Sequence, residues 1–148
     1  MTPETDEQRL AERVVSAMVA RDAFSQWLGI EVLEVAPRRS TCRLTVRDEM
    51  ANGFGVTHGG IAFSLADSAF AFACNTNGKV TVSIENSITY PAAIHVGDVL
   101  TAAAQEDAAS GRLGYYSARV TNQRGEVVAL FRGTAFKTSK DHVLNRES

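Results

Sequence analysis

A long apolar segment near the middle of the chain, residues 60–74, is interrupted by three polar side chains, Ser64, Asp67 and Ser68. No charged face remains that could turn toward water, which is typical of a helix buried on nearly all sides. The asparagine and glycine residues of 75–78 supply a stop signal. The pattern therefore predicts one central, buried helix.

The segments on either side of this helix follow other patterns. Apolar residues recur at helical spacing over 4–27, which predicts an amphipathic helix that ends at Gly29. Extended segments bounded by turn residues are predicted at 30–35, 41–46, 80–90, 99–105, 113–121 and 127–136. The turns between the last three segments are short enough for hairpins, so the carboxy-terminal half should form an antiparallel meander.

One apolar helix and about six antiparallel strands can bury their apolar faces together only if the sheet curls around the helix. The sequence therefore predicts an α+β fold, in which a curved antiparallel sheet wraps around one long central helix and an extra N-terminal helix packs on the outside. We expect a single domain over 1–148, with a core at about 28–138 and a short flexible tail.

Composition and charge exclude several classes of function. The formal net charge is −2 and the basic residues are scattered, so we expect no nucleic-acid partner. No apolar segment reaches the length that spans a bilayer and the amino terminus is acidic, so we expect a cytoplasmic protein with no membrane partner. Cys42 and Cys74 lie far apart without a second ligand nearby, which predicts two buried, reduced thiols, no disulfide and no metal site.

Asp67 is the one charged residue on the predicted central helix. An ionised carboxylate on an apolar helix costs several kcal/mol unless it is paired or hydrogen-bonded, so a sequence that keeps one needs a reason for it. At helical spacing Asp67 shares a stripe with Gly60, Ser64 and Ala71, which suits a close neighbour or a ligand. A structural alternative is that Asp67 caps a loop or pairs with a buried arginine. We expect a catalytic or ligand-orienting role.

The residues around this helix resemble a known family. The segment Asn52-Gly53-Phe54-Gly55-Val56-Thr57-His58-Gly59-Gly60 is followed by Leu65-Ala66-Asp67 on the helix. Together with later segments at 82–90, 97–102 and 129–133, it resembles the hotdog-fold acyl-CoA thioesterases of the phenylacetate-degradation (PaaI-like) type over most of the chain. The resemblance implies hydrolysis of an acyl-CoA thioester, of the aryl-acyl or medium-chain type such as phenylacetyl-CoA, to a free acid and CoA. It implies no cofactor, because coenzyme A is part of the substrate.

The motif supplies both groups that hydrolysis of a thioester needs. The carboxylate of Asp67 can attack the carbonyl carbon directly or activate a water molecule. Free backbone N–H groups at a helix start can bind the developing oxyanion, and glycines at 59 and 60 let a substrate approach the backbone. We expect the N–H of Gly59 to be this donor. The structural alternative for the glycines is a tight turn before a helix.

The spacing of these two groups predicts an oligomer. Gly59 and Asp67 are eight residues apart (67 − 59 = 8), or about 12 Å along a helix, too far for both to reach one carbonyl group. The two groups must therefore come from different protomers. Two copies with antiparallel central helices would form two equivalent sites, so we expect a homodimer at minimum. The resemblance implies the same arrangement, and further implies a homotetramer.

The resemblance also assigns roles to residues outside the helix. It places Asn52 beside the attacking water or the carbonyl group, His58 in support of the loop and the oxyanion geometry, and Ser83 beside the nucleophilic water. Each has a structural alternative. Asn-Gly is a common turn pair, the histidine can be purely structural, and a serine is ordinary in a half-exposed strand.

Binding of the coenzyme and of the acyl group is predicted at two further places. A turn with a cation and free N–H groups suits phosphates, which indicates Ser110-Gly111-Arg112. Enzymes that this chain resembles use this hairpin region and the position of Tyr90 for the nucleotide and the pantetheine arm. The acyl pocket is expected to be lined by Phe63 and Phe70.

Two functions of other classes remain open. A hotdog hydratase or dehydratase would use a histidine such as His58, with a carboxylate, for proton transfer on a β-hydroxyacyl thioester. A non-catalytic acyl-CoA sensor or binding module would need only the cleft. In such a module the carboxylate of Asp67 would be a liability beside a thioester.

Overall fold

The computed structural model describes residues 3–144 of the chain. Its helices are α1 (Asp6–Arg21), α2 (Ala23–Leu28) and α3 (Gly59–Cys74), with a short 3-10 helix, η1, at Asp48–Met50. Its strands are β1 (Glu31–Ala36), β2 (Arg39–Thr45), β3 (Lys79–Thr89), β4 (Val99–Ser110), β5 (Leu113–Thr121) and β6 (Val127–Asp141). Within the described residues, no helix combines the length and the apolar character that crossing a membrane requires.

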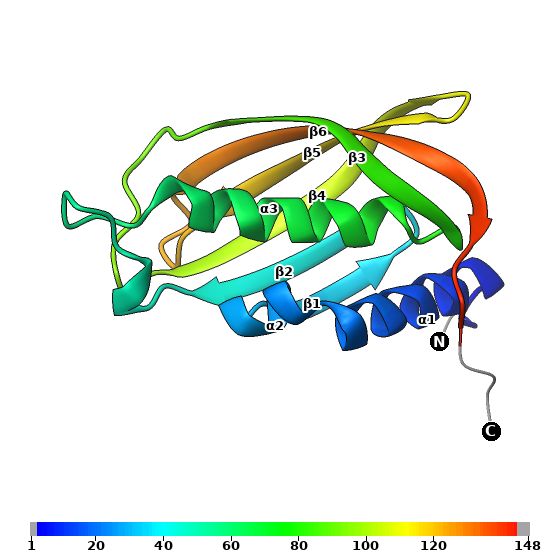
Figure 1. Cartoon of the computed structure of the whole chain (residues 1–148), viewed down its shortest axis with the longest axis horizontal. Helices are drawn as coiled ribbons and strands as arrows, with labels where there is room; N and C mark the ends of the chain where they lie inside the picture. Colours follow the sequence, from blue (N-terminus) through cyan, green and yellow to red (C-terminus); the bar gives the residue numbers. More distant parts are fainter. Residues whose placement is uncertain (1–2, 145–148) are drawn as a thin grey trace.

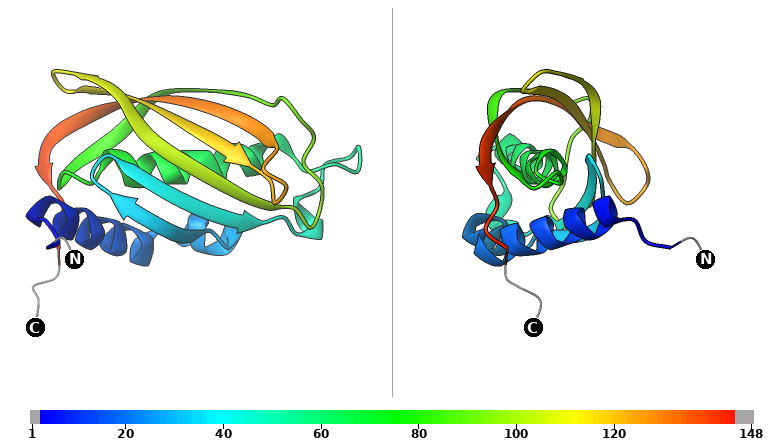
Figure 2. Two further views of the ribbon diagram at one scale, coloured as in Figure 1. Left: turned by 180° about the vertical axis from the view of Figure 1, so that it is seen from behind. Right: turned by 90° about the vertical axis from the view of Figure 1, so that its right-hand side faces the viewer.

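The strands form one antiparallel sheet in the order β1-β2-β4-β5-β6-β3. Strands β4, β5 and β6 follow one another as the predicted meander, whereas β3 pairs with β6 and lies at the edge of the sheet. The sheet curls around α3, which lies in its hollow, as the end-on view in Figure 2 shows. The predicted wrap of a curved sheet around one central helix is therefore confirmed (Figure 1).

Side chains of α3 and of the concave face of the sheet form the core. On α3, Leu65 and Phe70 are almost completely buried. In β2, Cys42 and Leu44 face the same core while Thr41, Arg43 and Thr45, which alternate with them, are partly or fully exposed, as the alternation predicts. Cys42 and Cys74 are free thiols, and burial raises the pKa of each to about 12. The prediction of two buried thiols is confirmed.

The N-terminal helix differs from its prediction, because the structure breaks it at Asp22. The Asp22 carboxylate accepts hydrogen bonds from the backbone N–H (2.9 Å) and from the hydroxyl group (2.6 Å) of Ser25, and so caps a new helix, α2. Ser25 also shares a 2.8 Å hydrogen bond with the hydroxyl group of Ser68 on α3. These contacts turn α2 onto the central helix, whereas α1 packs on β1. As predicted, α2 ends at Gly29, whose φ of 81° is typical of a left-handed C-cap.

Two strands extend beyond their predicted ends. The hairpin between β4 and β5 turns over only two residues, Gly111 and Arg112, and the φ of 59° at Gly111 suits the first position of a type II′ turn. Strand β6 runs on to Asp141, which is paired with Lys79 at the start of β3. Pairing with a neighbouring strand, rather than local propensity, extends both strands. The predicted flexible tail lies, from residue 145 onward, outside the described residues.

Candidate active site

Helix α3 begins at the motif His58-Gly59-Gly60. His58 is the N-cap residue, and its Nδ1 atom accepts a 2.9 Å hydrogen bond from the N–H of Gly60. The N–H of Gly59 lies at the first position of the helix, where no helical carbonyl group can accept its hydrogen bond. It also lies at the positive end of the helix dipole. Gly59 thus presents a backbone donor of the kind that stabilises an oxyanion.

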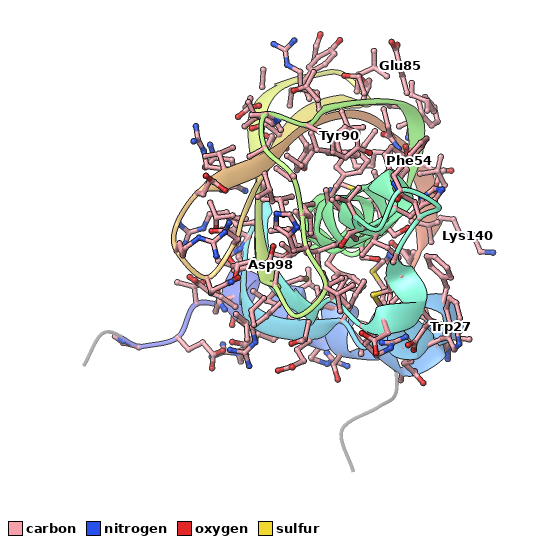
Figure 3. All side chains as sticks on the ribbon, turned by 90° about the vertical axis from the view of Figure 1, so that its left-hand side faces the viewer. Trp27, Phe54, Glu85, Tyr90, Asp98 and Lys140 are labelled. Carbon is pink, nitrogen blue, oxygen red and sulfur yellow. The ribbon has the colours of Figure 1, made fainter. Side chains whose placement is uncertain are left out.

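The peptide group between Gly59 and Gly60 is held on both sides by side chains. Its N–H donates to His58, and its carbonyl oxygen accepts a 2.8 Å hydrogen bond from the Tyr90 hydroxyl group. The Tyr90 ring also packs against Gly59, since a Cβ atom there would lie 3.1 Å from the Tyr90 hydroxyl oxygen. Figure 3 looks along α3 from its amino end and shows Tyr90 above the start of the helix. Tyr90 was predicted to contact the coenzyme, whereas this contact with the candidate oxyanion donor was not predicted.

Asp67 lies in the middle of α3 and is half-buried. Its Oδ1 atom accepts a 3.2 Å hydrogen bond from the side-chain amide of Asn86 on β3, and none of the ion pairs found within residues 3–144 involves it. The alternative of a buried arginine partner therefore gains no support from the structure. Burial raises the pKa of this carboxyl group, the Asn86 hydrogen bond opposes the rise, and the charge of Asp22 adds to it. The net upward shift makes this carboxylate a better proton acceptor than an ordinary exposed aspartate.

Ser83 and Asn86 form a short hydrogen-bonded chain that leads to Asp67. The Ser83 hydroxyl group donates to Oδ1 of Asn86 at 2.8 Å, and the Asn86 amide donates to Asp67. Ser83 is among the residues predicted from the sequence, whereas Asn86 is not. Strict alternation along β3 would place residues 83 and 86 on opposite faces, whereas a β-bulge between Ser83 and Glu85 lets both face the helix. Glu85 itself lies at the outer surface, as Figure 3 shows.

The stripe of small and polar residues predicted on the central helix is its most accessible side. Gly60, Ser64, Asp67 and Ala71 are all half-buried, whereas most other residues of α3 are buried. The Ser64 hydroxyl group turns back to the carbonyl oxygen of Gly60 at 2.7 Å, so it does not extend away from the helix. The chain's own sheet and N-terminal helices therefore leave this stripe partly open to a ligand or to a second copy.

Asn52 holds the loop that precedes α3. Its side-chain oxygen accepts hydrogen bonds from the backbone N–H groups of Phe54 (2.8 Å) and Val56 (3.3 Å), and its own N–H donates to the carbonyl oxygen of Val56 (2.6 Å). These bonds correspond to the turn role that the sequence allowed as an alternative to substrate contact. Phe54 is 93% exposed in this loop.

The predicted contacts for the coenzyme are not brought together within one chain. The turn Ser110-Gly111-Arg112 forms the tip of the β4–β5 hairpin, beyond the carboxyl end of α3 and away from the end at which Tyr90 contacts Gly59 (Figure 1). The guanidinium group of Arg112 donates to the carbonyl oxygen of Lys137 at 3.0 Å. For metals, residues 3–144 contain no group of three or more His, Cys, Asp or Glu side chains that could hold an ion.

The two phenylalanines predicted to line an acyl pocket differ in burial. Phe70 is 1% exposed, and its ring packs against Tyr116 and Phe131, with ring centroids 5.4 Å and 5.7 Å apart. Phe63 is half-buried, and its ring meets Phe131 edge-on at 5.7 Å. Phe70 is thus a core residue, and of the two only Phe63 is placed to meet a ligand at the surface of α3.

Sequence comparison assigns the family. The family model described as "Thioesterase superfamily" matches residues 54–129, which include α3 and the strands β3, β4 and β5. The acyl-coenzyme A thioesterase PaaI of Escherichia coli K12 is 38% identical over 121 residues, which cover 82% of this chain and 86% of that protein. A putative esterase of Archaeoglobus fulgidus is 36% identical over 133 residues, which cover 90% of this chain and 86% of that protein.

Solved structures agree with this assignment. The E. coli PaaI protein from the phenylacetic acid degradation operon matches with a TM-score of 0.89 at 34% identity, covering 92% of this chain and 99% of that one. A hypothetical thioesterase protein with coenzyme A from Streptococcus pneumoniae TIGR4 matches with a TM-score of 0.72 at 25% identity, covering 76% and 91%. The chain therefore belongs to the thioesterase superfamily and is a thioester hydrolase with the hotdog fold.

Proposed function

We propose that this protein hydrolyses acyl-CoA thioesters to the free acid and CoA, with aryl-acyl or medium-chain acyl groups such as phenylacetyl as its substrate class. The observation that carries the proposal is a half-buried carboxylate, Asp67, on the same helix as Gly59, whose first-turn N–H has no helical acceptor. Support for the substrate comes from E. coli PaaI, which is named an acyl-coenzyme A thioesterase, and from the S. pneumoniae protein with coenzyme A. No cofactor is part of the proposal, because CoA belongs to the substrate.

Asp67 supplies the base or the nucleophile of the reaction. Its raised pKa suits it to take a proton from a water molecule that attacks the carbonyl carbon. In the alternative route the carboxylate itself attacks and forms an anhydride, which water then hydrolyses. In both routes the carbon–sulfur bond breaks and CoA leaves as its thiol.

Gly59 stabilises the carbonyl oxygen as it gains negative charge. Its N–H points out of the first turn of α3, and the clamp formed by His58 and Tyr90 on the next peptide group limits how far that turn can move. Loss of one such donor in other enzymes costs about 10²–10³ in kcat, so its orientation matters to the rate.

Asp67 and Gly59 act together across two protomers. Helix α3 is continuous between them, so about 12 Å of helix separates the two groups within one chain. Two copies with antiparallel α3 helices bring Asp67 of one protomer beside Gly59 of its partner. The half-open stripe on α3 supports this pairing, as does the edge strand β3, on which Val82 and Ile84 are 45% and 56% exposed. We expect a homodimer at minimum and a homotetramer built from two dimers.

The hydratase or dehydratase alternative depends on His58. The structure uses Nδ1 of this histidine as the acceptor for the Gly60 N–H, so only Nε2 remains for proton transfer to a substrate. The binding-module alternative does not use Asp67, although the carboxylate lies half-exposed on the open stripe of α3. The thioesterase proposal uses Asp67 and Gly59 and assigns His58 the supporting role that its hydrogen bond indicates.

Release of free thiol from a panel of acyl-CoAs, aryl against straight-chain, tests the proposal. We expect Asp67→Asn to keep its fold and to lower turnover by roughly 10² or more. The control is Asp107→Asn, which changes an exposed aspartate hydrogen-bonded to Ser117 and should keep wild-type turnover. Near-wild-type turnover in Asp67→Asn would contradict the mechanism. Absence of thiol release from every acyl-CoA would contradict the function, and an ultraviolet change from double-bond formation would identify the dehydratase.

A further inference from the structure

We propose that Asn86 is a positioning residue that orients the Asp67 carboxylate for reaction, a role that rests on the proposed function of Asp67. Asn86 lies on β3, 19 residues along the chain from Asp67, and its amide donates to Oδ1 of the carboxylate at 3.2 Å. This bond engages Oδ1, so we expect Oδ2 to be the atom that meets water or substrate. Asn86 therefore selects which oxygen reacts and fixes the plane of the carboxylate.

The Asp67 carboxylate, which only accepts hydrogen bonds, and Ser83 together fix which end of the Asn86 amide faces Asp67. An asparagine side chain can present either its carbonyl oxygen or its NH₂ group, and only the NH₂ group can donate to a carboxylate. The Ser83 hydroxyl group donates to Oδ1 of Asn86 at 2.8 Å, which holds that oxygen toward Ser83. The amide nitrogen is thereby left for Asp67. Ser83 thus acts on Asp67 through Asn86, in addition to any contact with water.

The backbone of β6 makes room for the Asn86 side chain. Asn86 lies opposite Gly133 in the β3–β6 register. A Cβ atom at Gly133 would lie 3.1 Å from Oδ1 of Asn86 and 2.9 Å from two ring carbons of Phe70. Glycine at this position therefore lets the amide lie over the sheet beside the Phe70 ring. The position of the amide is set by packing as well as by its hydrogen bonds.

The groups around Asp67 make the Asn86 amide its main source of electrostatic support. Desolvation and the carboxylate of Asp22, at the junction of α1 and α2, both disfavour the charged form of Asp67. Cys74 on the same helix is a buried thiol whose pKa of about 12 keeps it neutral. From β3, Ser83 and Asn86 are neutral, and among the described contacts the Asn86 amide is the group that favours the carboxylate. Its removal should make Asp67 hold its proton to a higher pH.

The experiment compares Asn86→Ala, Asn86→Asp and Ser83→Ala through the pH dependence of kcat and through an NMR titration of the Asp67 carboxyl carbon. Asn86→Ala should move the acidic limb of the kcat profile up by about one pH unit and lower kcat about tenfold at the pH optimum, with KM changed less than about twofold. Asn86→Asp should move the limb further, because a second carboxylate of the same size repels the first. Ser83→Ala should move it in the same direction by less.

Two comparisons separate positioning from a general structural effect. Ser87 is an exposed serine on β3, the strand of Asn86, and its register partner is Arg132 on β6. Ser87→Ala should leave the pH profile of kcat and the Asp67 titration unchanged. The double variant with alanine at both 83 and 86 should behave like Asn86→Ala alone, because the two residues act through one chain of hydrogen bonds. Ser83 is exposed, so we expect Ser83→Ala to fold normally. Its pH profile and titration can therefore test the role of Asn86 even if the Asn86 variants fold poorly.

The NMR titration separates this inference from the proposed function. If the wild-type protein releases no thiol but the apparent pKa of Asp67 still rises in the order wild type, Asn86→Ala, Asn86→Asp, the contact assigned to Asn86 stands and the function fails. If turnover is normal but the titration and the acidic limb stay at their wild-type positions in both Asn86 variants, the role of Asn86 is overturned. Additive effects of the Ser83 and Asn86 substitutions would overturn the relay between them.

Discussion

Gly133→Ala tests whether the packing around Phe70 and Asn86, next to Asp67, is as tight as the structure indicates. Gly133 lies on β6, and a side chain at this position would point toward α3. A Cβ atom there would lie 2.9 Å from two ring carbons of Phe70. Carbon atoms do not approach this closely, so either the Phe70 ring or the backbone of β6 would have to shift. Phe70 has little room to move, because it is 1% exposed and packs against Tyr116 and Phe131. One methyl group should therefore strain this part of the core.

The expected magnitude follows from the cost of overpacking. Extra carbon atoms in a well-packed core destabilise by about 1–3 kcal/mol. For a chain of this size, 1 kcal/mol corresponds to roughly 2–4 °C in Tm, so Gly133→Ala should lower Tm by roughly 2–12 °C. The same Cβ atom would lie 3.1 Å from Oδ1 of Asn86, so turnover should fall as well.

Thermal unfolding, followed by circular dichroism at one fixed protein concentration, measures the effect. Gly53→Ala is the matched control, because a Cβ atom there would meet nothing within 4 Å and the backbone is not in the left-handed region. The control should unfold within about 1 °C of the wild type, as expected for an unstrained surface substitution. If Gly133→Ala also unfolds within about 1 °C of the wild type, the packing argument for Phe70 and Asn86 is wrong.

Two further predictions concern the ends of the site. Tyr90→Phe removes the hydroxyl group that donates to the Gly59 carbonyl oxygen, so it should lower kcat by up to about tenfold with little change in Tm. The control, Tyr115→Phe, changes a similarly exposed tyrosine on β5 and should leave both kcat and Tm at their wild-type values. Equal kcat values for the two variants would contradict the claim that the Tyr90 hydroxyl group holds the Gly59 peptide group in place. Burial raises the pKa of Asp67, so the folded state binds its proton more tightly than the unfolded state and loses stability as the pH rises through that pKa. Asp67→Asn should therefore be more stable than the wild type to denaturant at pH 7, with the difference shrinking toward about pH 4, and a variant less stable at pH 7 would contradict this.

The central helix and the strands could be predicted from the sequence because burial dictates their periods. Residues 60–74 have no charged face, and the alternation in β2 places Cys42 and Leu44 on the buried side. These signals are local and strong. The extra lengths of β4 and β6 were missed, because those residues are ordered by their partner strands rather than by their own propensity.

The break in the N-terminal helix combines a local cap with a contact between segments far apart in the sequence. Asp22 caps α2 through Ser25, and Ser25 bonds to Ser68 on the central helix, 43 residues away. The apolar spacing over 4–27 is compatible with one continuous helix. In the structure, the Asp22 cap and the tertiary hydrogen bond between two serines accompany the break.

In the candidate site, mainly the residues that belong to the sequence motif at the start of α3 and on that helix could be predicted. Asp67 and Gly59 follow from a lone carboxylate and from the glycines at a helix start, whereas the role of His58 came from the family resemblance. Asn86 was missed because the bulge in β3 changes the face of the sheet on which it lies. The alternation of buried and exposed residues along a regular strand does not predict where a bulge occurs. The contact of Tyr90 with Gly59 joins residues 31 positions apart, and it depends on the path of the chain after β3.

The claim that the site is built from two protomers is tested most directly by mixing two inactive variants. Asp67→Asn removes the carboxylate, and Gly59→Val places a side chain against Tyr90, where even a Cβ atom would lie 3.1 Å from the hydroxyl oxygen. In a mixed dimer one site carries both defects, while the other combines an intact Asp67 with an intact Gly59. Random exchange makes half of the dimers mixed, each with one of two sites restored, so about a quarter of wild-type thiol release should return. If native mass spectrometry shows the mixed dimers and no activity returns, both groups act within one chain and the two-protomer site is contradicted.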